Sequence, residues 1–228
     1  MEKPHHSISQ ILKNDTVHIG LLYFLLFAGG LWHALGVFQN MMRYLASPMM
    51  IGLAIILLMK VYPVFRDLRG RYFMWSTGVF VSGFAVELIG VSTGHIFGIY
   101  SYGFILQPQL FNVPIAIGCA WFTMLISSAA VIQRFVPFSH RLPSWIFAIA
   151  VACMMVFFDS IMEHAAVRLH YWQWEQGMPT MQNYAAWFVI GFFLIFIGRQ
   201  LRLFRTAVPM FSFHVFFAQI IYFIMTLA

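Results

Sequence analysis

Residues 144–168 read SWIFAIAVACMMVFFDSIMEHAAVR, an apolar run long enough to cross a bilayer as one helix. Two carboxylic acids, Asp159 and Glu163, interrupt this run in the half that ends at Arg168. A charged side chain at the centre of a membrane helix costs about 2.5–3.5 kcal/mol on insertion scales, so such residues are rare and usually functional. The stretch therefore predicts a membrane fold and marks a candidate site within it.

The composition of the whole chain also predicts a membrane protein. Of its 228 residues, 61% are hydrophobic and only 9% are charged, and the mean hydropathy is +0.82. The net charge of +6 does not indicate a nucleic-acid partner, because the basic residues fall in short connections between apolar runs. The polar start, MEKPHHSISQILKND, shows no signal-peptide pattern. Cys119 and Cys153 both lie in apolar runs, so we expect no disulfide framework.

Seven apolar runs come close to the length that a membrane span needs. They lie at about 17–41, 46–63, 72–94, 114–136, 144–168, 184–203 and 207–227. If the N-terminus is cytoplasmic, all lysines and arginines except Arg43 and Arg168 fall on the cytoplasmic side, as the positive-inside rule requires. We predict an all-α, polytopic protein with about seven transmembrane helices in a single domain, 1–228. We expect it in the inner membrane of a bacterium or archaeon, with its C-terminus outside.

Four ionisable residues share one predicted depth in the outer half of the bilayer. His33, Glu87 and Asp159 each lie about 16 residues into an outward-running span, and Glu163 follows Asp159 by one helical turn on the same face. Arg168, at the end of that span, could pair with a carboxylate. Two neighbouring carboxyl groups in a dry site do not both ionise easily, which leaves a neutral acid beside a carboxylate, as general acid–base catalysis requires.

Glycines at helical spacing surround Glu87 in the third run. Gly83, Gly90 and Gly94 lie near it, and the Gly90–Gly94 step would let another helix approach closely. We therefore expect the third helix to be an interior helix, with Glu87 facing the bundle. Alternatively, the four ionisable residues could form a buried polar cluster whose only role is to hold the helices together. For His33 this structural role is the better interpretation.

The two long connections on the outer side, 95–113 and 169–183, are aromatic and contain Gly and Pro, which is typical of loops, interfacial turns or a re-entrant lid. Their aromatic residues could line a site or form an interfacial belt, and Asn183 and Trp187 could face the same cavity. The candidate binding residues are Thr93, Tyr100, Tyr102, Trp172, Trp174, Asn183, Trp187 and His33. The histidines lack the clustered spacing of a membrane di-iron site, so we expect no metal.

Two stretches resemble the CruF-type carotenoid biosynthesis proteins. ELIGVSTGHIFGIYSYG (residues 87–103) is similar to the family's Glu, Gly-x-x-Thr-Gly and Phe-Gly-x-Tyr-x-Tyr pattern, and FDSIMEHAAVRLHYWQWEQGMPTMQNYAAWF (residues 158–188) is similar to its second motif. Val113-Pro114 and Trp121 fit the segment between them. One departure is His164, where the family commonly has proline. The resemblance implies a hydratase that adds water to the terminal double bond of an acyclic carotenoid, without a cofactor.

From the residues, we take Asp159 as the proton donor, Glu163 as the water-activating base and Glu87 as a charged partner that could exchange roles with Asp159. The expected partners are a carotenoid, the lipid bilayer and other enzymes of carotenoid biosynthesis. A cyclase or isomerase would use the same acid, and a proton or solute transporter could use the same carboxylates as a relay. A prenyltransferase is disfavoured because basic residues are scarce on the outer side. A covalent retinal protein is excluded because the last run has no lysine.

Overall fold

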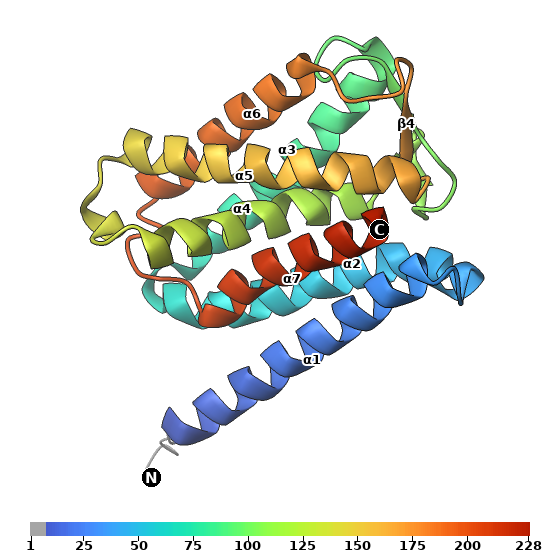
Figure 1. The fold of residues 1–228 in the computed structure, drawn as a ribbon. Coiled ribbons are helices and arrows are strands. Elements are labelled where there is room, and N and C mark those ends of the chain that lie inside the picture. Colours follow the sequence, from blue (N-terminus) through green and yellow to red (C-terminus); the bar gives the residue numbers. More distant parts are fainter. Residues whose placement is uncertain (1–7) are drawn as a thin grey trace.

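The computed structural model describes the backbone of residues 8–228 and the side chains from residue 15 onward. Most of the polar start, on which the absence of a signal peptide was judged, lies outside the described residues. The chain forms a bundle of long helices with short strands at one end (Figure 1). The helices are α1 (Ile8–Ala34), α2 (Gln39–Val61), α3 (Arg69–Thr93), α4 (Ala116–Phe135), α5 (Ser144–Arg168), α6 (Met181–Gln200) and α7 (Met210–Leu227).

Six helical stretches of the described chain are long and apolar enough to cross a membrane. One of them, 39–93, contains both α2 and α3, because the 3-10 helix η1 (Tyr62–Leu68) joins them without a gap. Phe65 interrupts the helical geometry there, with φ −100° and ψ 34°, so the stretch is kinked rather than straight. The all-α, polytopic architecture agrees with the hydropathy pattern.

The predicted boundary between the first two runs was wrong. The first run was placed at 17–41 and the second at 46–63, whereas α1 ends at Ala34 and α2 already begins at Gln39. Gly36 and Phe38 have positive φ values of 67° and 54°, so the chain reverses in these few residues. Hydropathy does not register this turn, because the residues around it are themselves mostly apolar. The fifth run, in contrast, coincides with α5.

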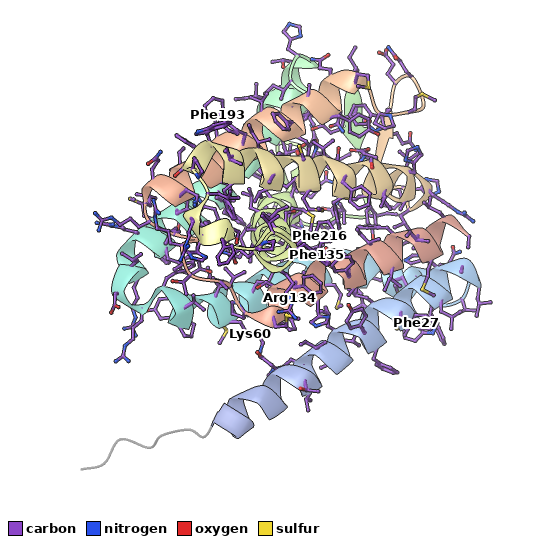
Figure 2. The ribbon with its side chains drawn as sticks, turned by 60° about the vertical axis from the view of Figure 1, so that its left-hand side comes forward. Phe27, Lys60, Arg134, Phe135, Phe193 and Phe216 are labelled. Atoms are coloured by element: carbon purple, nitrogen blue, oxygen red, sulfur yellow. The ribbon has the colours of Figure 1, made fainter. Side chains whose placement is uncertain are left out.

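Helix α4, rather than α3, is the interior helix of the bundle. Of the 18-residue window scored in α4, 89% is buried, and Figure 2 shows this helix end-on with the others around it. Helix α3 buries a single stripe that includes Glu87. Phe27 on α1 and Phe193 on α6 point outward, as expected for helices that meet lipid (Figure 2).

The two connections at about 95–114 and 169–183 contain short strands that the sequence did not reveal. Strand β1 (Tyr100–Tyr102) pairs antiparallel with β4 (Trp172–Trp174), and β2 (Gln109–Leu110) pairs with β3 (Val113–Pro114). The register of the first pair sets Tyr100 opposite Trp174 and Tyr102 opposite Trp172. Because alternate residues of a strand share a face, all four aromatic side chains project from the same side of this ribbon.

Arg199 differs from the other basic residues that were assigned to the cytoplasmic connections, because it is almost completely buried. Its guanidinium donates to the carbonyl oxygens of Phe204 (2.9 Å) and Leu142 (2.6 Å), and it lies 4.6 Å from the Phe147 ring centroid. It therefore joins the α4–α5 connection to the α6–α7 connection.

Candidate active site

Glu87 is buried on α3 and accepts three hydrogen bonds. The Tyr100 and Tyr102 hydroxyls donate to Oε2 at 2.5 and 2.8 Å, and the Trp121 indole N–H donates to Oε1 at 3.0 Å. The expectation that Glu87 faces the bundle is confirmed, since only 5% of the residue is exposed. Three donors around one carboxyl group stabilise its charged form, whereas its burial acts against that form.

The two tyrosines that hold Glu87 lie outside the helical spans, on β1. Burial, followed by the charge of Glu87, raises the pKa of Tyr100 and of Tyr102 above the ordinary value of a phenol. Both hydroxyls therefore keep their protons and serve as donors to Glu87 at any physiological pH.

Glu163 is held by the other strand of the same ribbon. The indole N–H groups of Trp172 and Trp174 both donate to its Oε2 at 2.8 Å. The Tyr100 and Trp174 ring centroids are 5.0 Å apart, so the donors of the two glutamates pack against each other. Because one face of the ribbon supplies donors to both Glu87 and Glu163, β1 and β4 fix these carboxyl groups relative to each other.

Asp159 is completely buried behind Glu163. The Asn183 side-chain amide donates to Asp159 Oδ2 at 2.8 Å and lies 3.5 Å from Glu163 Oε1, so one amide bridges the two carboxyl groups. Asn183 is in the first turn of α6, where Thr180 caps the helix by accepting from its backbone N–H. Asp159 Oδ1 is buried without a hydrogen-bond partner among the described residues.

A cavity of about 350 Å³ reaches this cluster from the membrane-facing helices. Glu87, Glu163 and Asn183 line it, whereas Asp159 does not. Its aromatic walls include Trp121 and Trp187, whose rings stack with centroids 4.2 Å apart and planes 14° apart. The remainder is mostly apolar, with leucines and methionines from α1 and α2. An apolar cavity that ends at a few convergent polar groups is typical of a ligand-binding site.

A second pocket of about 260 Å³ has a mixed lining. Its polar walls include Arg43, Ser101, His170 and Gln173, and Phe104 and Ile105 add apolar surface. Tyr102 lines both this pocket and the apolar cavity.

Two of the candidate residues lie away from the cluster. Thr93 is exposed, and its hydroxyl donates to the Ile89 carbonyl within the last turn of α3. His33 does not line the cavity; its ring lies 6.0 Å from the Tyr222 ring on α7, and its Nε2 is buried without a partner among the described residues. The structure therefore separates both residues from the carboxyl groups.

The region after Glu163 also differs from what the sequence indicated. His164 is exposed and its Nδ1 contacts the Ser160 carbonyl oxygen at 2.9 Å, so it does not add a titratable group to the cluster. Helix α5 continues unbroken past it to Arg168. The Arg168 guanidinium donates to the Leu227 carbonyl at the end of α7, and not to a carboxylate as we had considered.

Gly83 and Gly90 accommodate aromatic rings rather than a neighbouring backbone, which corrects the interpretation of the Gly90–Gly94 step. A Cβ at Gly83 would lie 2.6 Å from Trp121 Cγ, and one at Gly90 would lie 2.6 Å from the Phe97 ring. Gly94 ends α3 with φ 68°. The small residues thus make room for the aromatic walls of the cavity.

Replacing Gly83 by leucine should destabilise the protein and displace Trp121 from Glu87. Overpacking of this kind costs about 1–3 kcal/mol. The measurement is the thermal denaturation midpoint in detergent, with Gly78→Leu on the same helix as the control, because a Cβ at Gly78 meets nothing within 4 Å. Equal midpoints for the two variants would contradict the described packing of Trp121.

Replacing His33 by leucine should leave activity unchanged and should not lower stability. The imidazole Nε2 has no described partner, so its removal breaks no hydrogen bond that the structure records. The measurements are the formation of the expected hydrated carotenoid and the denaturation midpoint. Asn183→Leu is the contrasting variant, because it breaks the amide bridge to Asp159. Loss of activity in the His33 variant would restore this residue to the site.

Among the residues that the structure describes, no group of three or more His, Cys, Asp or Glu side chains is placed to hold a metal ion. Sequence reasoning did not place Trp121 in the site, although its indole donates to Glu87 from the central helix. The sequence indicated only that Trp121 fits the segment between the two resembling motifs, and tryptophans are common in membrane helices.

Comparison with known proteins bears on the same residues. Residues 46–227 match the family described as carotenoid biosynthesis protein, and this range contains every member of the cluster. Bisanhydrobacterioruberin hydratase of Haloarcula japonica is 25% identical over 113 residues, which cover 47% of this chain but only 38% of that relative. No solved structure matches the chain. The extent of the family match shows that this chain belongs to the carotenoid biosynthesis protein family.

Proposed function

We propose that this protein is a membrane enzyme that hydrates the terminal carbon–carbon double bond of an acyclic carotenoid and needs no cofactor. The observation that carries the proposal is the pair Glu87 and Glu163, which face the end of an apolar cavity and are held by four aromatic donors of one ribbon. The family match and the name of the Haloarcula japonica relative support a carotenoid as substrate and hydration as the reaction.

Glu163 is the better proton donor, although the sequence led us to choose Asp159. Glu163 lines the cavity, whereas Asp159 lies behind it and reaches it through Asn183. Oε2 of Glu163 accepts both indole bonds, whereas Oε1 has only the longer 3.5 Å contact with the Asn183 amide and is the oxygen that carries the proton. Asp159 is then a positioning residue that shares one proton with Glu163 across the Asn183 bridge.

The proposed reaction has two proton transfers. Glu163 gives its proton to the less substituted alkene carbon, and the π electrons form the new C–H bond and leave a tertiary cation. A water oxygen forms the C–O bond, and Glu87 accepts the proton that the water releases. The product is a tertiary alcohol, and transfer of a proton from Glu87 back to Glu163 through solvent restores the site.

The surroundings of the two glutamates suit a cationic intermediate. Glu87 and the faces of Trp121 and Trp187 lie at the cavity wall. A carboxylate in a dry site stabilises a developing cation, and each aromatic face adds about 0.5–2 kcal/mol. The candidate binding residues that line the cavity are Tyr100, Tyr102, Trp172, Trp174, Asn183 and Trp187.

The second pocket, which Tyr102 also lines, favours hydration over cyclisation. A cyclase loses a proton from the cation and needs no water, whereas a hydratase needs both an apolar substrate and water. The apolar cavity suits the substrate, and the second pocket offers water polar side chains next to Tyr102, whose hydroxyl is bonded to Glu87. A proton transporter would require polar groups along the whole path, but the far part of the cavity is mostly apolar.

We further propose a single domain with seven spans, with α2 and α3 crossing separately and the N-terminus in the cytoplasm. The cluster then lies near the outer face of the inner membrane. Reporter fusions should place residue 68 and residue 205 in the cytoplasm and residue 105 outside. A fusion at 105 that reports a cytoplasmic location would contradict this topology.

Expression of the gene in a host that accumulates an acyclic carotenoid tests the proposed reaction. The extracted pigments are separated by chromatography, and their molecular masses are measured by mass spectrometry. A hydratase gives products heavier by one or two waters, a cyclase or isomerase gives new pigments of unchanged mass, and a transporter leaves the pigments unaltered. Either of the last two outcomes would overturn the proposal.

A further inference from the structure

The apolar cavity extends far beyond the space around the carboxyl groups. Its lining residues run along α1 from His18 to Trp32 and along α2 from Met42 to Ile56. Each of these stretches covers 14 residue steps, which correspond to about 21 Å of helix. The part between α1 and α2, here named the α1–α2 groove, is therefore long, and the cavity that it belongs to reaches Glu87 and Glu163.

The side of the α1–α2 groove is apolar and exposed. Leu21 and Leu25 on α1 and Met49 and Ile56 on α2 line the groove and are each 39–51% exposed. In a bilayer these side chains face the hydrocarbon region, where an apolar molecule is dissolved. Figure 1 shows α1 diverging from the bundle toward its N-terminal end.

Both ends of the α1–α2 groove are closed by the chain itself. Near the start of α1, the Lys60 ammonium of α2 bonds to Asp15 and lies 5.0 Å from the Phe211 ring centroid. At the other end, the short turn 35–38 joins α1 to α2. A molecule that reaches the carboxyl groups by this route therefore comes from the lipid side, between the two helices.

We propose that the α1–α2 groove is the lateral access route and the binding site for the long polyene tail of the substrate, while its end group lies at Glu163 and Glu87. The identity of the tail rests on the proposed function. The family match begins only at residue 46, so α1 lies outside it. One wall of the groove thus comes from outside the matched region. We therefore expect α1 to determine which polyene tails are accepted and to have no part in the reaction itself.

Gly52 offers a direct test, because it lines the cavity and a Cβ there meets nothing within 4 Å. Gly52→Phe should therefore fill the α1–α2 groove without a clash in the protein. Gly78→Phe is the matched control, since Gly78 has equally open surroundings but does not line the cavity. Leu25→Trp narrows the groove from the α1 side and gives a second variant. Size-exclusion profiles and circular dichroism confirm that each variant folds.

The measurement is the amount of purified acyclic carotenoid that each variant retains after reconstitution in lipid nanodiscs, read from its visible absorbance. It is made in a Glu163→Gln background, so that binding is separated from conversion. We expect Gly52→Phe and Leu25→Trp to retain about tenfold less pigment than the background, and Gly78→Phe to match it.

Equal pigment in the Gly52→Phe variant and its background would overturn the groove assignment, as would a background protein that retains none. Failure of hydration alone has a different signature. In that case the groove variants would still retain less pigment than the background, but the wild-type protein would form no hydrated product. This result would refute the proposed reaction and support the binding site.

Discussion

Replacing Glu163 by glutamine should reduce carotenoid hydration by about 10²–10⁴-fold while the fold is retained. The amide has the size of the carboxyl group, and its oxygen can still accept the indole bonds of Trp172 and Trp174. It cannot supply the proton that forms the tertiary cation. The measurement is the initial rate of product formation by the purified protein, with the denaturation midpoint as the check on folding.

Two further variants separate this role from a general effect of charge removal. Glu175→Gln is the matched control, because Glu175 is exposed one residue after β4. Asp159→Asn should be less severe than Glu163→Gln, since Asp159 acts through Asn183 and does not line the cavity. If Asp159→Asn abolished hydration and Glu163→Gln did not, Asp159 would be the donor and the assignment from cavity lining would be wrong.

Replacing Glu87 by glutamine should stop hydration at a different step. In this variant Glu163 still protonates the alkene, but no carboxylate at position 87 accepts the proton from water, so the cation returns to an alkene by giving a proton back to Glu163. In deuterium oxide the recovered substrate should therefore gain deuterium at its end group without gaining oxygen. Mass spectrometry of the recovered carotenoid detects both changes, and the loss of hydration should again be about 10²–10⁴-fold.

The Glu163→Gln variant is the comparison for this experiment, because it should give neither deuterium incorporation nor alcohol. The reverse pattern, with exchange in the Glu163 variant and none in the Glu87 variant, would exchange the two roles. Such an exchange is chemically reasonable, since both side chains line the same cavity. The hydrogen bonds favour our assignment, because both oxygens of Glu87 accept strong donors.

The sequence was sufficient to single out Glu87, Asp159 and Glu163, because an acid within an apolar run is costly and therefore conspicuous. It could not rank them. Which carboxyl group meets the cavity depends on how α5 rotates against α6, and hydropathy carries no information on that rotation. The bridge from Asn183 to Asp159 and Glu163 became visible only with the packed helices.

The aromatic residues show a different limit of sequence reasoning. For Trp172 and Trp174 the sequence favoured an interfacial belt over a place in the site, since both roles suit an indole with one polar edge and a belt is the commoner of the two. Their role as donors follows from the pairing of β1 with β4, two strands of only three residues each. Contacts between segments so far apart in the chain have no local signature. Counting residues from the start of each span likewise placed His33 at the depth of the acidic residues. Its ring nevertheless packs against Tyr222 and not against a carboxyl group.

The most direct test of the proposed hydration uses purified wild-type protein, an acyclic carotenoid and water enriched in oxygen-18. If Glu163 protonates the end group and water captures the cation, the product is a tertiary alcohol whose oxygen carries the label of the solvent. The Glu163→Gln protein should form none of this product. A product of unchanged mass, or an alcohol whose oxygen is unlabelled, would contradict the mechanism.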